Sequence, residues 1–344
     1  MSAIPEPAID SLLAKGLRNQ WYVICPSSFV AEKPVSLRRC GYRMVFWRDT
    51  SGKAHALEDR CPHRGVPLSC GIVMGDRIAC GYHGVQVDTN GVAVCVPGAP
   101  GSKLEGSKST KTFPLQERNG MIFAYVGDEL HPEPPELVLP EELSSPEYSW
   151  FPCYAEWAGD YRYVIDNVMD PMHGTFLHKQ SHSMSFGDTK ASFRIAETPT
   201  GFIFEKEGQR NVNFDWTEYG HTGAFWMRLE IPYPKTGGPG GNFHIVGMYT
   251  PISETMAAVM HWRCRKVEGW ERDTWRFLYK NRLEARHWHV LEQDRVMLEQ
   301  CDPDANKHES LYAHDMGLVR LRRVLRNQAV AQLTALAEAG RHVA

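Results

Sequence analysis

Two pairs of residues with metal-binding side chains stand in the first third of the chain. Cys61 and His63 form the first pair, and Cys80 and His83 form the second after sixteen intervening residues. Glycine follows each pair closely, which favours two turns that could present four soft or borderline ligands to one metal centre. Ribbon-type zinc sites more often pair like residues, so structural zinc is the weaker alternative. The four side chains are therefore predicted to bind one metal centre together.

A second group of potential ligands lies on a predicted helix over residues 156–179. Helical spacing would place on one face Asp166, Asp170 and His173. His178 would point about 140° away from His173 at roughly 100° per residue, so both imidazoles can reach one atom only if the helix is distorted. Pro171 and Gly174 favour such a distortion, and we expect a bulge or break near Gly174.

A third ligand is expected from the long helix predicted over residues 270–300. Its candidate carboxylates are Glu284, Glu292, Asp294 and Glu299. On a helical wheel Asp294 interrupts an apolar stripe formed by Leu283, Val290, Met297 and Cys301. Glu292 and Glu299 project to the opposite side, and Glu284 lies off the stripe. A carboxylate that faces a core is costly unless it binds a metal or a partner, so Asp294 is predicted to complete a facial triad of two histidines and a carboxylate for Fe(II).

The first constellation resembles the Rieske motif, C-x-H followed by C-x-x-H, in which two thiolates hold one iron of a [2Fe-2S] cluster and two imidazoles hold the other. Rieske proteins of respiratory complexes carry an extra cysteine after each pair, where this chain has Val66 and Tyr82, so no loop disulfide is expected. They also place hydroxyl groups where this chain has Val85 and Val87. The resemblance therefore implies a low-potential cluster of the oxygenase type.

With both motifs present, the chain resembles the catalytic (alpha) subunit of a Rieske non-haem iron aromatic ring-hydroxylating oxygenase. Its segment Asn167-x-x-Asp170-x-x-His173-x4-His178 matches the catalytic motif of that family. The resemblance implies one mononuclear Fe(II) per chain, held by His173, His178 and Asp294, and a head-to-tail homotrimer. Asp170 would bridge His173 to His83 of a neighbouring subunit. Asn167 would orient Asp170 or lie near the iron, unless it is simply a satisfied polar group of the helix.

The fold class is predicted to be α+β. Short apolar runs broken by Gly, Pro and Asn indicate an all-β domain over residues 1–130, which the resemblance identifies as a Rieske domain. A proline-rich and acidic linker is predicted over residues 131–150. Residues 151–344 combine strands with hairpin spacing and two helical segments, 270–300 and 311–339, which predicts an antiparallel sheet with long helices. The resemblance implies a helix-grip catalytic domain there.

The composition narrows the classes of partner and compartment. The 344 residues include 38 Lys and Arg against 41 Asp and Glu, a net charge of −3, which argues against nucleic acid or an anionic membrane as the main partner. No apolar run approaches the length of a membrane span, and no secretory signal is legible. The 9 cysteines are not spaced as a disulfide framework. A cytoplasmic location is therefore expected.

The function implied by the resemblance is oxygenation of an aromatic compound. Electrons would come from NAD(P)H through a separate reductase, a ferredoxin or both, and O2 would be the oxidant. We expect cis-dihydroxylation of an aryl acid or two-ring aromatic, with monooxygenation or oxidative O- or N-demethylation as the alternative. An electron-transfer protein without oxygen chemistry is the alternative from another class. The candidate cations for a substrate carboxylate are Arg194, Arg210 and Arg228, and His287 is a candidate pocket residue.

Overall fold

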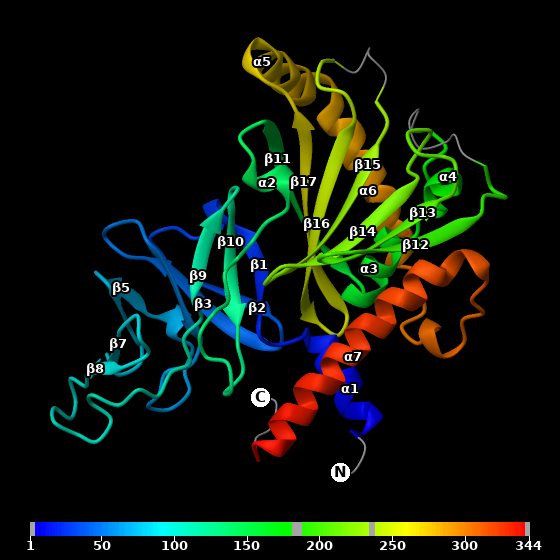
Figure 1. The fold of residues 1–344 in the computed structure, drawn as a ribbon. Coiled ribbons are helices and arrows are strands. Elements are labelled where there is room, and N and C mark those ends of the chain that lie inside the picture. Colours follow the sequence, from blue (N-terminus) through cyan, green and yellow to red (C-terminus); the bar gives the residue numbers. More distant parts are fainter. Residues whose placement is uncertain (1–3, 181–187, 234–237, 341–344) are drawn as a thin grey trace.

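The protein consists of two β-rich parts that lie side by side (Figure 1). The structure, a computed structural model, describes residues 4–180, 188–233 and 238–340. The smaller part contains most of the N-terminal third of the chain, and the larger part contains the long C-terminal strands and helices. This α+β arrangement confirms the fold class expected from the sequence.

Three small antiparallel sheets form the N-terminal part. The first pairs β1 (Gln20–Pro26), β10 (Met121–Val126) and β9 (Leu115–Arg118); the second pairs β2 (Val35–Arg39), β3 (Tyr42–Arg48) and β4 (Ala54–Glu58); the third pairs β5 (Ile72–Met74), β6 (Arg77–Ala79), β7 (Gln86–Val87) and β8 (Ala93–Cys95). The third sheet contains a tight turn in which the Asp88 carboxylate accepts hydrogen bonds from the backbone N–H groups of Asn90 and Val92. Gly91 supplies the positive φ of 77° that this turn needs.

A seven-stranded antiparallel sheet forms the centre of the C-terminal part. Its strand order is β11 (Tyr148–Ala158), β17 (Met256–Lys266), β16 (Phe243–Ser253), β15 (Phe225–Ile231), β14 (Trp216–His221), β13 (Gly201–Lys206) and β12 (Phe193–Thr198). The predicted hairpin between β12 and β13 is present, with Thr198 paired to Gly201. Strand β11 extends to Ala158, so the first residues of the helix predicted over 156–179 are a strand instead.

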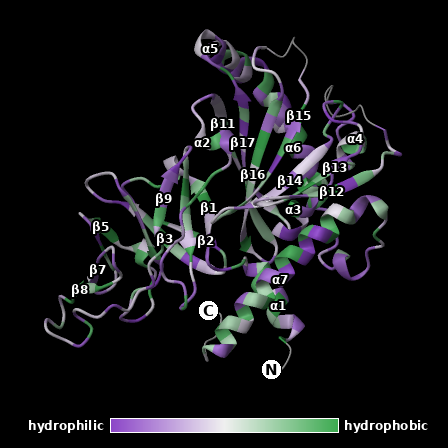
Figure 2. Cartoon of the chain, viewed as in Figure 1, coloured by the Kyte–Doolittle hydropathy of each residue, from purple (hydrophilic) through white to green (hydrophobic). Residues whose placement is uncertain are grey.

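Helices cover one face of this large sheet. They are α1 (Glu6–Lys15), α3 (Tyr161–Met169), α4 (His173–Leu177), α5 (Gly269–Leu278), α6 (Glu284–Leu298) and α7 (Met316–Glu338). The short helix α2 (Glu141–Ser144) packs on the opposite face, where its Leu143 lies in one cluster with Met260 and Trp262. A π-helical turn, Tyr279–Leu283, interrupts the helix predicted over 270–300, and the one predicted over 311–339 begins at Met316. Short 3-10 turns span Ser27–Phe29, Leu68–Cys70, Ala305–Lys307 and Ala313–Asp315. Figure 2 shows hydrophilic and hydrophobic residues alternating along α7, as expected for a helix with one buried face.

The two faces of the large sheet pack against different parts of the protein, as the side chains of β17 show. Met260 and Trp262 face the N-terminal part, where the Trp262 ring stacks on Phe123 with 6.2 Å between ring centroids. Ala257 and Val259, on the alternate positions, pack in the core beneath α3 and α7. Because side chains alternate across a strand, one strand builds both the contact between the two parts and the interior of the C-terminal part.

The N-terminal helix packs on the C-terminal part. Ile9 and Leu12 of α1 lie in one core with Leu321 and Leu325 of α7. The predicted first domain, residues 1–130, therefore includes a helix whose apolar contacts are with the other domain. Within the predicted linker, α2 and the start of β11 are regular elements. The limits 1–130, 131–150 and 151–344 stay predictions as domain boundaries.

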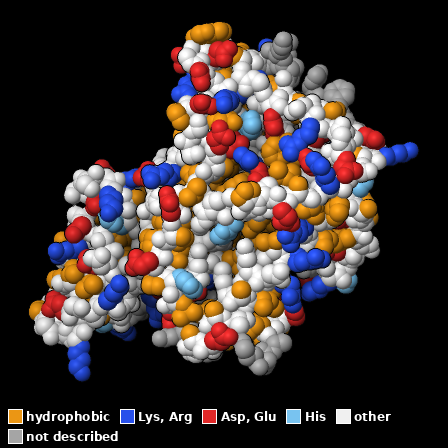
Figure 3. All heavy atoms as spheres, in the orientation of Figure 1, with side chains coloured by type: hydrophobic (Ala, Val, Ile, Leu, Met, Phe, Trp, Pro, Cys, Tyr) orange, Lys and Arg blue, Asp and Glu red, His pale blue; other side chains and the backbone are white. Residues whose placement is uncertain are grey.

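The surface carries mixed charge. On the face drawn in Figure 3, cationic and anionic side chains are interspersed rather than gathered into one basic area. Among the helices of the described residues, none has the length and hydrophobicity needed to cross a bilayer. This face therefore lacks the broad basic area that is typical of nucleic-acid binding.

A buried arginine joins the two parts. Arg39 on β2 is 1% exposed, and its Nε donates to the carbonyl of Ile24 at 2.9 Å. Its Nη2 donates to the Tyr154 hydroxyl at 2.8 Å and to the Glu156 carboxylate at 2.9 Å, both on β11. Because a buried guanidinium needs its donors satisfied, these bonds fix β2 against β11.

We predict that Arg39→Met lowers the free energy of unfolding by about 2–4 kcal/mol, because it leaves the buried Ile24 carbonyl without its donor and removes two bonds across the domain contact. Urea unfolding followed by tryptophan fluorescence measures the change. The matched control is Arg77→Met, since Arg77 forms an exposed pair with Asp76 and should change stability by less than about 0.5 kcal/mol. Equal losses in the two variants would contradict the proposed weight of Arg39.

Candidate functional site

The two Cys/His loops have the same backbone geometry. The N–H of Cys61 donates to the carbonyl of Val66 at 2.8 Å, and the N–H of Gly65 donates back to Cys61 at 2.9 Å. The loop after β6 repeats this pattern at Cys80, whose N–H donates to Val85 at 2.8 Å while Gly84 donates to Cys80 at 2.9 Å. The two glycines have φ values of 76° and 72°, a conformation that residues with a Cβ rarely adopt. Two matching turns therefore face one another.

The side chains of these loops separate by burial. Cys61 and Cys80 are 2% and 3% exposed within an apolar cluster, whereas His63 and His83 are exposed. The two imidazole rings lie 4.7 Å apart between centroids. Burial raises the pKa of the Cys61 thiol, and a hydrogen bond from the backbone N–H of His63 acts in the opposite direction. Two thiols on the inside and two imidazoles on the outside are a donor set that fits a cluster with one iron on each side.

The neighbours of these loops agree with the sequence analysis. All nine cysteines lie in the described part of the chain and none forms a disulfide. Val85 and Val87 are buried beside the cysteines and offer no hydroxyl group. Tyr82 is 56% exposed, and its ring centroid lies 3.8 Å from that of His83. The loops thus present an aromatic surface next to the exposed imidazoles.

The second constellation lies where a helix breaks. Helix α3 begins after Asp160, whose carboxylate accepts a hydrogen bond from the N–H of Arg162 at 2.8 Å, and ends at Met169. Helix α4 begins at His173. The expected distortion is therefore present, but it lies at residues 170–172 rather than at Gly174, because Pro171 disfavours a helical conformation in the residue before it and has no N–H to donate.

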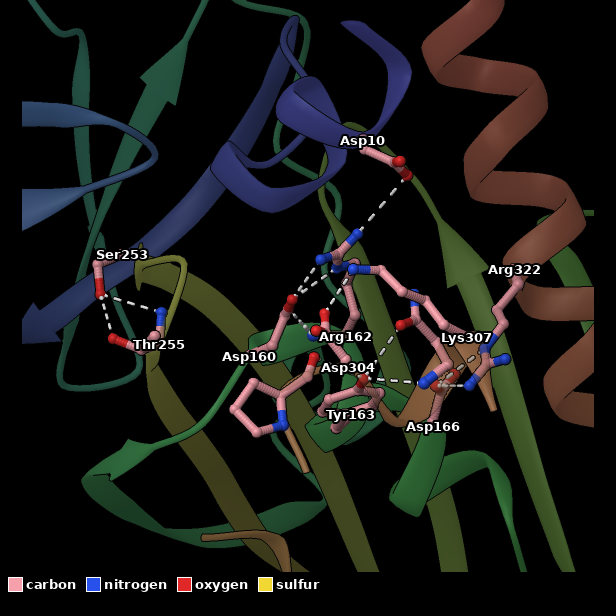
Figure 4. A network of polar contacts seen from close by, with 12 residues as sticks. Asp10, Asp160, Arg162, Tyr163, Asp166, Ser253, Thr255, Asp304, Lys307 and Arg322 are labelled. Atoms are coloured by element: carbon pink, nitrogen blue, oxygen red, sulfur yellow. Dashed lines mark hydrogen bonds and ion pairs between the residues drawn. The ribbon is translucent and has the colours of Figure 1, made fainter. Parts of the chain in front are cut away.

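The expected single face of acidic residues is wrong. Asp166 turns toward α7, where its carboxylate accepts hydrogen bonds from Nε and Nη2 of Arg322 at 3.0 Å and 2.7 Å (Figure 4). Asp170 ends α3 and accepts hydrogen bonds from the backbone N–H groups of Met172 and His173 at 2.7 Å and 3.2 Å. The helix ends before Asp170 can continue the face that holds Asp166.

His173, His178 and Asp294 converge on one point. Nε2 of His173 lies 3.5 Å from Oδ1 of Asp294, and Nε2 of His178 lies 3.3 Å from the same oxygen. One ligand atom from each residue lies within 4.8 Å of the others, and the group is the one cluster of potential metal ligands of this kind among the described residues. Two imidazole nitrogens and one carboxylate fit the facial triad of a mononuclear iron.

A hydrogen bond at Nδ1 orients the ring of each of the two histidines. Nδ1 of His173 is hydrogen-bonded to the backbone carbonyl of Asp170, and Nδ1 of His178 to Oε1 of Gln293 at 3.0 Å. Such partners fix the tautomer that leaves Nε2 free as a ligand. Gln293 was not anticipated from the sequence, where it carries no signal beyond its place next to Asp294.

The electrostatics of the triad favour a charged carboxylate. Burial alone would raise the pKa of Asp294, but hydrogen bonds and charge from His173 and His178 outweigh burial and hold that pKa well below its usual range. Burial would likewise lower the pKa of His173, and Asp294 reverses the direction. In a metal site the cation would replace the imidazolium protons as the partner of Asp294.

Of the four candidate carboxylates, Asp294 is the one that the structure places beside the two histidines. The apolar stripe that was used to choose it is only partly buried. Asp294 is buried, Glu292 and Glu299 pair with Arg295, and Glu284 pairs with Lys280. However, Met297 and Cys301 of the predicted stripe are exposed. The inward face of the π-helical turn and of α6 carries Leu283, His287, Val290, Leu291, Asp294 and Leu298. A spacing of seven drifts about 20° per repeat on a helix of 3.6 residues per turn, so the stripe leaves the core after Val290.

The other two predicted residues lie beside the triad. Nδ2 of Asn167 donates to Oδ1 of Asp294 at 3.4 Å. Of the roles expected for Asn167, this contact favours a position near the proposed iron over one that orients Asp170. The Asp170 side chain is 35% exposed, so its carboxylate is accessible from outside the chain. The coupling role of Asp170 stays a prediction.

A cavity of about 800 Å³ opens next to the triad. Strands β15, β16 and β17 and helix α6 enclose it, and apolar side chains such as Phe214, Leu229, Ile231, Phe243 and Ile245 form much of its wall. His287 also lines it, as its candidate role required. An apolar cavity of this size with a few polar groups suits a small planar molecule.

The cations selected from the sequence lie elsewhere. Arg194 and Arg210 both pair with Glu205 and are 62% and 45% exposed. Arg228 pairs with Glu142 and Glu218. These three arginines are therefore satisfied by carboxylates and do not line the cavity. The buried arginine that does line it, Arg263, was missed because the face to which a strand residue points is not readable from one sequence.

Two family models match the chain. The Rieske [2Fe-2S] domain matches residues 20–114, and the vanillate O-demethylase oxygenase C-terminal domain matches residues 157–331, just over half of the chain. The triad lies within the second match and the Cys/His loops lie within the first.

Relatives and solved structures agree with these matches. The chain is 36% identical over 164 residues to the vanillate O-demethylase oxygenase subunit of Pseudomonas sp. (strain HR199 / DSM 7063), covering 48% of this chain and 46% of the relative. It is 31% identical over 163 residues to the toluene-4-sulfonate monooxygenase system iron-sulfur subunit of Comamonas testosteroni, covering 47% and 46%. The matched chain thus spans about half the length of these curated relatives. The terminal oxygenase of carbazole 1,9a-dioxygenase from Novosphingobium sp. KA1 has a TM-score of 0.72 at 23% identity over 93% of this chain and 95% of that chain, which shows the same fold. The chain belongs to the Rieske oxygenase family whose catalytic half is the vanillate O-demethylase oxygenase C-terminal domain.

Proposed function

We propose that this protein is the oxygenase component of a multicomponent system that oxidises an aromatic compound with O2. The observation that carries the proposal is the convergence of His173, His178 and Asp294 at a cavity of about 800 Å³. An electron-transfer protein without oxygen chemistry would need neither the triad nor the cavity.

Each predicted ligand has a role in this proposal. Cys61, His63, Cys80 and His83 would hold a [2Fe-2S] cluster, with the buried thiols on one iron and the exposed imidazoles on the other. His173, His178 and Asp294 would hold one Fe(II), which supplies the activation of O2 when bound. The chain's own residues orient these ligands: Asp170 holds His173 through its backbone carbonyl, and Gln293 holds His178.

The distance between the two sites favours a role for a second subunit. In Figure 1 the small sheet that contains β7 and the helix α4 lie on opposite sides of the molecule. We propose a homotrimer in which Asp170 couples His173 to His83 of a neighbouring subunit. The partly exposed Asp170 carboxylate supports such a contact.

The proposed electron source is NAD(P)H, which would act through a separate reductase, a ferredoxin or both. The exposed His63, His83 and Tyr82 offer a surface for such a partner. Nine free cysteines fit a reducing compartment, so we propose a cytoplasmic location.

Two reactions are candidates for the oxidation itself. Cis-dihydroxylation is the reaction that the sequence analysis favours. Oxidative O-demethylation is favoured by the match of residues 157–331 to the vanillate O-demethylase domain and by the relative named for vanillate. Where the substrate carbon lies relative to the iron would decide between them.

The metal content tests the cofactor assignment. Protein produced with ample iron should contain about three irons and two acid-labile sulfides per chain. His63→Ala should lose the sulfide and the cluster spectrum and keep the mononuclear iron, because its site is formed by other residues. Stoichiometric zinc without sulfide would contradict the assignment.

Two further variants separate a ligand from a coupling residue. Asp294→Ala should reduce the mononuclear iron content by about tenfold or more, because the triad loses its anionic member. Asp170→Asn should retain both metals and lose most product formation, because it removes the carboxylate charge beside His173. Iron and sulfide analysis and NADH-coupled turnover are the measurements, and Glu299→Ala is the control, since Glu299 pairs with Arg295. Loss of the mononuclear iron in Glu299→Ala would show that the wrong carboxylate had been assigned to the triad.

The products decide the reaction. The protein, a reductase and NADH should be supplied with methoxybenzoates, plain benzoates and biaryl ethers under labelled O2. A diol with two labelled oxygen atoms indicates cis-dihydroxylation, and formaldehyde release indicates O-demethylation. Turnover restricted to aliphatic quaternary amines would refute the aromatic assignment.

A further inference from the structure

The charge of the cavity wall is strongly uneven. Among the described residues that line it, the carboxylate is Asp294, which is occupied by His173 and His178. The wall also carries Arg263, and Arg282 and Arg286 lie on its exposed side. Acidic side chains that could neutralise these arginines from the wall are therefore absent from the described lining.

Arg263 lies inside the cavity wall rather than at its mouth. It follows Val259 and His261 on the same face of β17, since side chains alternate along a strand, and it is 3% exposed. Its Nη1 donates to the hydroxyl of Tyr279 at 2.9 Å. Its guanidinium carbon lies 5.1 Å from the ring centroid of Trp288. The guanidinium is thus held by neutral groups.

A comparison with Arg39 shows what Arg263 lacks. Arg39 is equally buried and reaches the carboxylate of Glu156. For Arg263, the contacts within the described chain include no carboxylate within 4.0 Å. A guanidinium has five N–H donors, and burying a cation without a counter-ion is costly. The unused donors beside an open cavity therefore favour an anion supplied by a ligand.

His287 lines the wall close to Arg263, and both side chains contact Tyr279. Nε2 of His287 lies 3.2 Å from the Tyr233 hydroxyl, and its buried Nδ1 has no hydrogen-bond partner among the described residues. Burial, with further contributions from Arg263 and Arg286, lowers the pKa of His287 to about 3. The ring is therefore neutral and adds no charge to the wall, and its Nδ1 is covered by the surrounding protein, so the donors that a ligand in the cavity can reach are those of Arg263.

We infer that Arg263 forms an anion subsite that binds the carboxylate or sulfonate group of an aromatic substrate. This inference rests on the proposed function and names the class of substrate for the same cavity. The guanidinium supplies a planar pair of donors that matches two oxygens of such a group. Exposed Arg282 and Arg286 would attract the anion toward the cavity.

The position of the subsite fits a substrate of one aromatic ring. His287, which lines the wall close to Arg263, precedes Asp294 by seven residues on α6, which separates their backbones by about 10 Å along the helix axis. A ring with its anionic group at one end and the reacting carbon at the other spans most of that length, and the apolar wall around Phe214 and Phe243 covers its faces.

Ligand binding tests the subsite without turnover. Calorimetric titration of the iron-loaded protein should compare 4-methoxybenzoate with its methyl ester, and 4-methoxybenzenesulfonate as the second anion. Wild type should bind at least one anion about tenfold or more tightly than the neutral ester. Arg263→Gln should weaken anion binding about ten- to hundredfold and leave the ester unchanged, because it removes charge-assisted hydrogen bonds and no apolar contact surface.

Arg194→Gln is the matched control, since Arg194 is an exposed arginine that pairs with Glu205 away from the cavity, and its selectivity should equal that of wild type. If melting shows that Arg263→Gln does not fold, Arg263→Lys decides, because it keeps the charge without the planar fork and should weaken anion binding about three- to tenfold. Equal effects on acid and ester, or no preference for either anion in wild type, would overturn the subsite. Iron content and O2 consumption in the same preparations report separately on the proposed function.

Discussion

The constraint on which the site depends is the break in the chain between Met169 and His173. A continuous helix would turn His173 and His178 to different sides, and the two could not share one metal with a carboxylate of α6. Because Pro171 stops α3, the chain starts a new short helix with its own direction. The Asp170 carboxylate then accepts the first backbone N–H groups of that helix, and its carbonyl is hydrogen-bonded to the His173 ring. The same residue therefore ends one helix, starts the next and orients a proposed ligand.

The large sheet supplies the other wall of the site. Because side chains alternate along each strand, one face of the sheet can line the cavity while the other packs against the N-terminal part. On β17, Met260 and Trp262 pack against the N-terminal part, while His261 and Arg263 point to the cavity. A shift of one residue in register would exchange these sets and bury two polar side chains in the contact between the parts. The contact made by Trp262 and Phe123 and the wall of the cavity are thus fixed by the same pairing of β17 with β16 and β11.

The sequence predicted what depends on local spacing and missed what depends on distant contacts. The two Cys/His loops and the need for a distorted helix follow from short spacings, and the structure has both. Asp294 was chosen from a stripe that is only half buried, since Met297 is exposed, and the structure places it beside both histidines. Asp166 turned to Arg322, 156 residues away, and Gln293 reached His178 across 115 residues. Which face of a strand is buried, and hence the place of Arg263, depends on the assembled sheet.

The buried charged side chains of the C-terminal part differ in the partner that neutralises each of them. Asp294 is buried and charged because two imidazoles lie against it, and these are the groups that would share a metal with it. Asp166 is buried against Arg322, a pair complete within the chain. Among the described residues, the Arg263 guanidinium contacts a tyrosine hydroxyl and an aromatic ring and no carboxylate. Because an unpaired buried ion is expensive whereas a paired one is tolerated, an incomplete charge that faces a cavity indicates a partner that enters and leaves. The Asp166–Arg322 pair is therefore structural, whereas the charges of Asp294 and Arg263 face the cavity, where a ligand can complete them.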